Sequence, residues 1–111
     1  MPVFITQARW THKAIEGLVA HPEDRYAEVK GLFERAGGRV LAYYMTFGEY
    51  DFCIISEAPD AVSMFSVLAT AAAGGGVTDM RTVLAITTAE AQQGFSKAKE
   101  TASQFRSAGQ S

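Results

Sequence analysis

Residues that could do chemistry gather near the middle of this 111-residue chain, where Glu49, Tyr50 and Asp51 follow Gly48. A carboxylate beside a phenol at the mouth of a pocket can orient a small polar ligand or take part in proton transfer. The structural alternative is that Asp51 closes a turn by accepting backbone hydrogen bonds, while Tyr50 packs with its hydroxyl at the rim. Successive strand residues point to opposite faces, so Tyr50 and Asp51 would not both line one pocket. We expect the structural role, with ligand binding as the alternative.

An apolar strand face with a cationic anchor is the second candidate site. Depending on register, its apolar members are Tyr43, Met45, Phe47, Cys53 and Ile55. Arg9 and Arg81, expected on outer strands, would then hold a small apolar, aromatic or carboxylated ligand. The alternative is a face buried in a dimer, with the arginines in ion pairs at its rim. Together with His12, which could reach a strand end but is expected at the surface, the candidate ligand-binding residues are Tyr43, Glu49, Tyr50, Asp51, Arg81 and His12.

Cys53 is the one cysteine of the chain, and a buried thiol that packs as a small hydrophobe is expected. A nucleophilic thiol would need a base, and only His12 and His21 are available. The two histidines are not spaced with other ligands as in a metal site. The glycines at 74–76 follow an expected helix, so they form no phosphate loop. We name no catalytic residue, and expect no metal or cofactor.

The composition limits the partners and the setting. The chain carries 12 acidic and 10 basic residues, a net charge of −2, which gives no general attraction to nucleic acid or to anionic membranes. A single cysteine excludes an intramolecular disulfide and favours a reducing, cytoplasmic setting. The longest weakly polar stretch, residues 61–76, is too short and too polar to predict a membrane span.

Hydrophobic periodicity predicts the elements that position these residues. Strands are expected over residues 2–10, 39–47, 50–57 and 77–88. A helical pattern over residues 12–36 breaks at His21-Pro22, because the residue before a proline avoids the α region, and resumes at Pro22. A further helix is expected over residues 59–73. In the second strand, simple alternation separates Leu41, Tyr43, Met45 and Phe47 from Val40, Ala42, Tyr44 and Thr46.

The order β-α-β-β-α-β predicts an α+β, ferredoxin-like sandwich. Four antiparallel strands would carry two helices on one face. The strands are apolar on both faces, so the second face also needs a cover. The simplest cover is the sheet of a second subunit across a two-fold axis, which gives a dimeric α/β barrel.

The chain also resembles a known family. Gly48-Glu49-Tyr50-Asp51, followed by Glu57-Ala58-Pro59-Asp60, resembles the signature of the GYD domain family of small uncharacterised proteins. The resemblance extends over most of residues 2–88 and includes Trp10-Thr11 and residues 81–87. It implies the ferredoxin-like fold of the dimeric α/β barrel type, and it implies no established activity.

The end of the chain adds a helix to this fold. Residues 89–105 show a narrow apolar stripe that includes Phe95 and Phe105, too little to fold alone, so the helix should dock on the body or on a neighbouring subunit. The expected division is a GYD-type domain at 1–88, a helical extension at 89–106 and a disordered tail at 107–111.

Three functions fit this architecture. The preferred one is a small-molecule-binding or accessory oligomeric protein, a homodimer or an assembly of dimers. A cofactor-independent enzyme of the barrel class, monooxygenase-like or isomerase-like, is the second, and it rests on analogy of fold. The third is a structural assembly module. Nucleic acid and membranes are not expected as partners.

Overall fold

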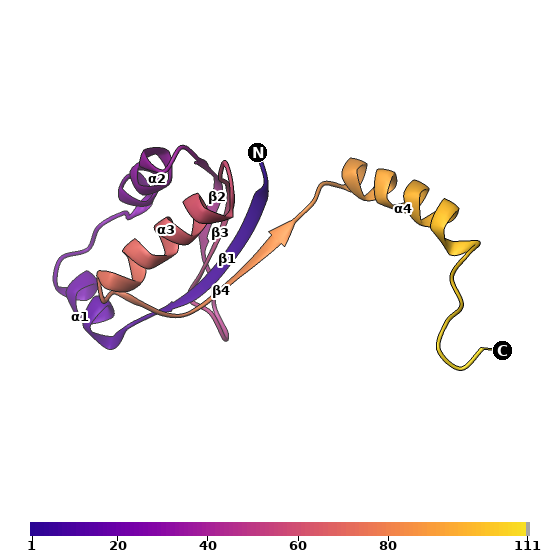
Figure 1. The fold of residues 1–111 in the computed structure, drawn as a ribbon. Coiled ribbons are helices and arrows are strands. Elements are labelled where there is room, and N and C mark those ends of the chain that lie inside the picture. Colours follow the sequence, from indigo (N-terminus) through magenta and orange to yellow (C-terminus); the bar gives the residue numbers. More distant parts are fainter. Residues whose placement is uncertain (111) are drawn as a thin grey trace.

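The structure is a computed structural model that describes residues 1–110. Its elements confirm the predicted ferredoxin-like order, with an additional helix at the end (Figure 1). In chain order they are β1 Val3–Trp10, α1 His12–Ala20, α2 Tyr26–Arg35, β2 Arg39–Met45, β3 Phe52–Glu57, α3 Ala61–Ala73, β4 Val77–Ala85 and α4 Thr88–Ala102.

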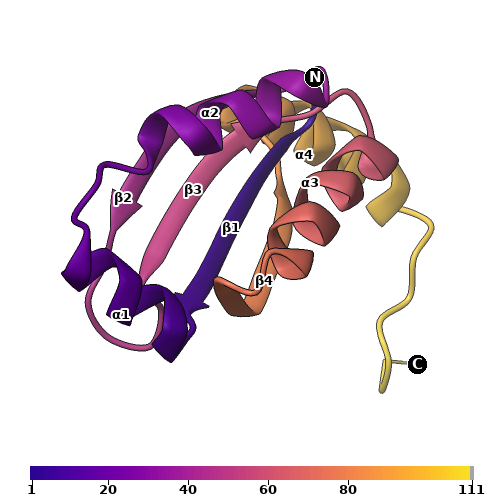
Figure 2. The same cartoon turned by 90° about the vertical axis from the view of Figure 1, so that its left-hand side faces the viewer.

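The four strands form one antiparallel sheet in the order β2-β3-β1-β4. Helices α2 and α3 lie side by side on one face of this sheet, and α1 lies at its end (Figure 2). The strand order places β1 and β3 in the centre and β2 and β4 at the edges. Arg9, expected on an outer strand, therefore belongs to a central strand.

The core lies between the sheet and the two helices. Strands β1 and β3 alternate strictly, and the buried side chains of both strands point toward the helices, as a sheet with one helix-covered face requires. The buried apolar residues are Phe4, Ala8, Phe33, Phe52, Ile54, Ala58, Met64 and Val67.

A bulge in β2 overturns part of the predicted alternation. Val40 pairs with Ser56 and Tyr43 pairs with Ile54, so two residues rather than one intervene between helix-facing positions. The extra residue shifts the pleat, as β-bulges do, and puts Val40 on the same face as Tyr43. The predicted separation of these two residues is wrong, because simple alternation does not allow for an inserted residue.

The helix starts follow from local capping. Thr11 accepts a hydrogen bond from the Ala14 amide, and Asp60 accepts one from the Ser63 amide. The predicted start of the second helical segment at Pro22 is four residues too early. Asp24 accepts a hydrogen bond from the Tyr26 amide, and α2 begins at Tyr26.

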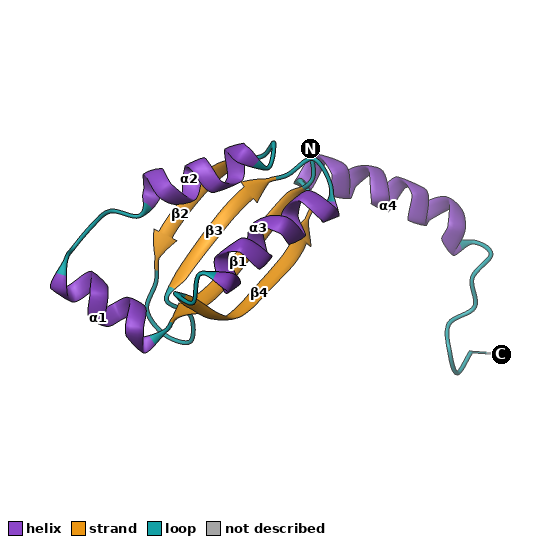
Figure 3. Ribbon diagram, turned by 60° about the vertical axis from the view of Figure 1, so that its left-hand side comes forward, coloured by secondary structure: helices purple, strands orange, loops and turns teal. Residues whose placement is uncertain are grey.

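Helix α4 comes directly after the edge strand β4 in the chain and extends away from the sheet as an arm (Figures 1 and 3). The side chains of Phe95 and Phe105 are 75% and 70% exposed. The arm raises the radius of gyration to 18.4 Å, whereas a compact chain of this length has about 13 Å. The helix does not dock on its own body, which leaves the neighbouring subunit as the predicted docking partner.

The tail predicted at residues 107–111 lies partly outside the described residues, because Ser111 is not among them. Within residues 1–110, no helix has the length and apolar character that crossing a bilayer requires.

Candidate functional site

Asp51 ties the β2–β3 loop to the end of β1. Its carboxylate accepts a 2.8 Å hydrogen bond from the backbone amide of Trp10, and its own amide donates to the carbonyl of Ala8 at 2.9 Å. Its carbonyl accepts from the Thr46 amide at 2.8 Å. The side chain of Asp51 thus binds the amide of a neighbouring strand rather than an amide of its own turn.

Arg9 joins the other signature residues to the same corner. Its Nε donates a 2.6 Å hydrogen bond to the carbonyl of Glu49, and its guanidinium lies 5.6 Å from the centre of the Tyr50 ring. Its remaining nitrogens lie 3.7 Å from the Glu49 carboxylate and 3.5 Å from that of Asp79. These contacts hold the Arg9 side chain at the rim of the sheet.

Trp10 and Thr11 are held from two sides. Asp51 binds the amide of Trp10, while the amide and hydroxyl of Thr11 donate to the carbonyls of Gly76 and Gly75 at 2.9 and 3.0 Å. Trp10-Thr11 and Gly48-Glu49-Tyr50-Asp51, which are part of the family resemblance, therefore meet at one corner, formed by the end of β1, the β2–β3 loop and the α3–β4 turn. This signature corner fixes the backbone that carries the Trp10 indole.

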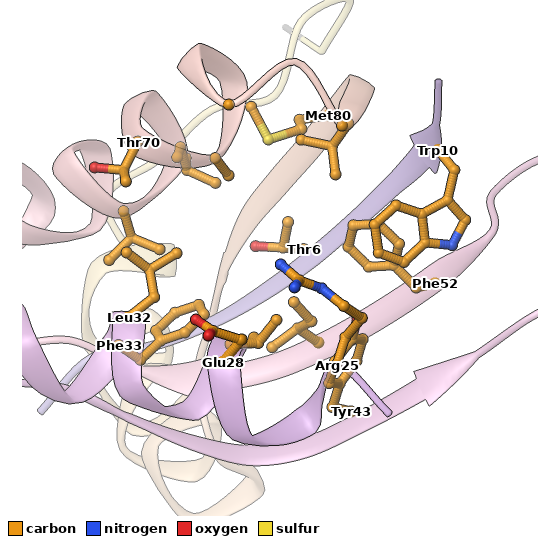
Figure 4. A pocket seen from close by; sticks show the side chains of 18 of the residues that line it. Thr6, Trp10, Arg25, Glu28, Leu32, Phe33, Tyr43, Phe52, Thr70 and Met80 are labelled. Atoms are coloured by element: carbon orange, nitrogen blue, oxygen red, sulfur yellow. The ribbon is translucent and has the colours of Figure 1, made fainter. Parts of the chain in front are cut away.

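The Trp10 indole forms one wall of a cavity between α2, α3 and the helix-facing side of the sheet (Figure 4). The cavity has a volume of about 310 Å³ and mostly apolar walls. The rings of Trp10 and Phe52 lie 4.9 Å apart, and those of Phe52 and Tyr43 lie 5.9 Å apart at 78°. An aromatic corner therefore closes the sheet side of the cavity.

Two polar side chains border this apolar space. The hydroxyl of Tyr43 is buried and has no hydrogen-bond partner among the described residues. Burial raises the pKa of this phenol above its ordinary value of 10.0, against a smaller lowering by the nearby Arg25 guanidinium. The hydroxyl is therefore protonated at neutral pH and can donate a hydrogen bond. Arg25, at the start of α2, reaches into the cavity (Figure 4).

A smaller opening adjoins the first cavity. It is lined by residues of α1, of the α1–α2 loop and of β2, and it shares Trp10, Arg25 and Tyr43 with the larger cavity. These three side chains stand between the two spaces. An occupant of either space would contact them.

The structure divides the six predicted binding residues among separate places. Glu49, Tyr50 and Asp51 lie together at the signature corner, but Tyr43 faces the helices. Arg81 pairs with Gln7 and lies on the opposite, open face of the sheet. His12 is exposed on α1, with Nε2 lying 3.5 Å from the Glu16 carboxylate. The sheet itself separates Tyr43 from Arg81.

The predicted apolar face does not form, because the register of the β2–β3 pair places its members on both sides of the sheet. Cys53 and Ile55 lie on the open face, whereas Tyr43 and Met45 pair with the helix-facing residues Ile54 and Phe52. Tyr43 therefore shares no face with Cys53.

Sequence reasoning missed Arg25, Glu28 and Thr6, which all line the cavity. The signal for Arg25 was its position in the connection that follows the break at Pro22, since binding residues are often found on loops that a rigid scaffold positions. Thr6 stood in an apolar strand, where its hydroxyl now pairs with that of Thr82 at 3.0 Å. In the described part of the chain, no three histidine, cysteine or carboxylate side chains are grouped to hold a metal ion.

The open face of the sheet has an apolar row at its centre. Ala42, Ile55, Ile5 and Val83 are consecutive partners across all four strands. Helices α2 and α3 both cover the other face, so this row is left without a helix (Figure 2). On one side the next row contains Tyr44, Cys53, Gln7 and Arg81.

The chain is similar to known proteins in sequence and in fold. A model of the GYD domain matches residues 4–94. A protein of Thermus thermophilus named "Glutamine synthetase and cystathionine beta-lyase binding protein" is 40% identical over 81 residues, which cover 72% of this chain and 84% of that protein. Among solved structures, TTHA0845 from Thermus thermophilus has a TM-score of 0.51 and 17% identity, covering 78% of this chain and 95% of that one. The last similarity shows the fold alone.

Proposed function

The chain belongs to the GYD domain family, and from this premise we propose that it is a homodimeric accessory protein that binds another protein. The observation that carries the proposal is the apolar row on the open face of the sheet. Ile5 and Ile55 are central-strand partners on the face that has no helix over it. Covering such a face with a second sheet removes apolar surface from water and is a standard packing of two sheets.

A two-fold axis through the centre of this face would satisfy both subunits at once. In such an isologous interface each row meets a copy of itself, so the apolar row of one subunit packs on that of the other. The polar residue Arg81 then lies toward the rim, where charge is tolerated.

The α4 arm supports the same assembly. We assign residues 1–88 to the GYD-type domain and residues 89–106 to an extension that docks on the second subunit. An amphipathic helix of this length gains its stability mainly from packing its apolar face. Phe95 and Phe105 are exposed in the single chain, so docking would bury both.

The partner-binding half of the proposal rests on the relative. Its name states that it binds glutamine synthetase and cystathionine beta-lyase. We infer that this chain also binds a metabolic enzyme, and glutamine synthetase of the same organism is the first probe. Biolayer interferometry with the immobilised enzyme should show saturable binding. If the chain binds neither of the two named enzymes, the partner-binding half of the proposal is contradicted.

Native mass spectrometry tests the dimer. We expect a dimer for the natural chain, a monomer for Ile5→Glu, and a dimer for the matched control Val62→Glu, whose side chain on α3 is 79% exposed. Circular dichroism must show that Ile5→Glu is folded. Deleting residues 89–111 should raise the dimer dissociation constant about tenfold or more, because two phenylalanine contacts are lost. A monomeric natural chain, or a folded Ile5→Glu dimer, would overturn the proposal.

A further inference from the structure

The cavity between α2 and α3 is a cleft that opens to solvent. At about 310 Å³ this space lies at the lower end of the range of small-molecule sites. Its walls are mostly apolar, as they are in such sites. The volume and the lining therefore fit a small organic molecule.

The aromatic corner favours a planar apolar group. Trp10 and Phe52 are tilted by 47°, and Tyr43 meets Phe52 edge-on at 78°. Aromatic pairs prefer such offset and edge-to-face arrangements, so a further ring can add to this cluster without displacing a member.

Two donors point to an acceptor on the ligand. The buried Tyr43 hydroxyl has no partner among the described residues, and a buried donor left unpaired is costly. Arg25 uses Nη1 in an ion pair with Glu23 at 3.3 Å, and a guanidinium has further N–H groups to donate. Guanidinium and hydroxyl donors together suit a carboxylate.

Charged side chains border the cavity. Arg25, Arg35 and Glu28 line it, and Glu23, which is paired with Arg25, lines the adjoining opening together with Asp24. The two arginines are the donors that an anionic group would meet.

We propose that this cavity binds a small aromatic carboxylic acid, with its ring against Trp10 and Phe52 and its carboxylate accepting from the Tyr43 hydroxyl and the Arg25 guanidinium. The site goes beyond the proposed homodimer and does not depend on it, because the cavity lies on the helix-covered side of each subunit. The family signature gains a role here. Asp51 holds the Trp10 backbone and so positions the cavity wall.

The chain has a built-in reporter for the test. Trp10 is its one tryptophan, so its fluorescence reports the cavity directly. Phenylacetate is the probe, and phenylacetamide is the neutral control of the same shape. We expect saturable fluorescence change with phenylacetate, and binding about tenfold weaker with phenylacetamide, since the charge-assisted bonds are lost. Equal binding of the two, or no saturable change with phenylacetate at millimolar concentration, would overturn the proposal.

Four variants separate the site from the rest of the fold. Tyr43→Phe and Arg25→Gln should each weaken phenylacetate binding about tenfold, the equivalent of one strong hydrogen bond. Tyr44→Phe is the matched control, because Tyr44 lies on the opposite face of the same strand, and it should bind as the natural chain does. Ala71→Leu adds bulk to the cavity wall and should abolish binding while the protein stays folded.

Thermal melts of all four variants establish that they are folded. If Tyr43→Phe and Tyr44→Phe bind equally well, or if folded Ala71→Leu still binds, the cavity is not the site. The dimer is measured separately by native mass spectrometry, so each proposal can fail without affecting the test of the other.

Discussion

Replacing Asp51 by alanine tests whether the family signature acts by holding Trp10. The carboxylate accepts the partly buried Trp10 amide at 2.8 Å, and alanine removes this acceptor. The residue's amide also donates to Ala8 and its carbonyl accepts from Thr46, but these two bonds involve only the backbone and survive the substitution. The change therefore isolates one hydrogen bond between the β2–β3 loop and β1.

The expected loss follows from the kind of bond. A hydrogen bond to a charged group contributes about 1.5–3 kcal/mol, and the orphaned amide adds its own desolvation penalty. We expect Asp51→Ala to lower the free energy of unfolding by about 2–3 kcal/mol. Asp51→Asn keeps an oxygen acceptor without the charge and should lose about 1 kcal/mol. Glu49→Ala removes an equal charge from a 70% exposed ion pair and should lose less than about 1 kcal/mol.

Urea unfolding followed by Trp10 fluorescence and by circular dichroism is the assay. With a slope of about 1–3 kcal/mol per molar urea, the midpoint for Asp51→Ala should fall by about 1 M or more. All variants must be compared at one protein concentration, because association adds to apparent stability. If Asp51→Ala is as stable as Glu49→Ala, the bond is not structural, and a direct binding role for Asp51 regains its place.

Three further perturbations test the packing and the caps. A Cβ at Gly38 would clash with the backbone carbonyl of the last residue of β3, so Gly38→Ala should cost about 2–3 kcal/mol in urea unfolding, whereas Gly17→Ala, with open space around it, should stabilise by about 0.5–1 kcal/mol. The buried Ser56 hydroxyl has no partner among the described residues, so Ser56→Ala should leave the free energy of unfolding unchanged or raise it by up to about 1 kcal/mol, which a thermal melt would register. A loss of stability of that size would instead reveal a partner for the hydroxyl. The hydrogen bond from the Ser63 amide lowers the pKa of Asp60 below its ordinary value of 3.8, so its stabilising effect is complete above that pH and is lost as the pH falls through 3.8 and below. Asp60→Asn should therefore show a shallower loss of urea resistance over that acidic range, and identical pH profiles would contradict this cause.

Local signals determined much of the fold from the sequence. The break at His21-Pro22 separated two helices because proline restricts its predecessor, and hydrophobic periodicity predicted the four strands. The signature around Asp51 predicted the family from short sequence spacing alone, whereas the bond of Asp51 to the Trp10 amide on β1 replaces the turn-closing role that was expected.

Tertiary structure decided what lies together. The register of β2 against β3 placed Tyr43 under the helices, and the register of β4 against β1 placed Arg81 on the open face, so the predicted site divided between two sides of one sheet. Neither fact is encoded in local periodicity, because register and strand order arise from pairing between distant segments. Arg25 joined Tyr43 and Trp10 for the same reason: a cavity is bounded by residues far apart in sequence, and its existence depends on how two helices rest on a sheet. The sequence by itself determined the elements and their apolar faces, and packing alone decided which of those faces enclose a site.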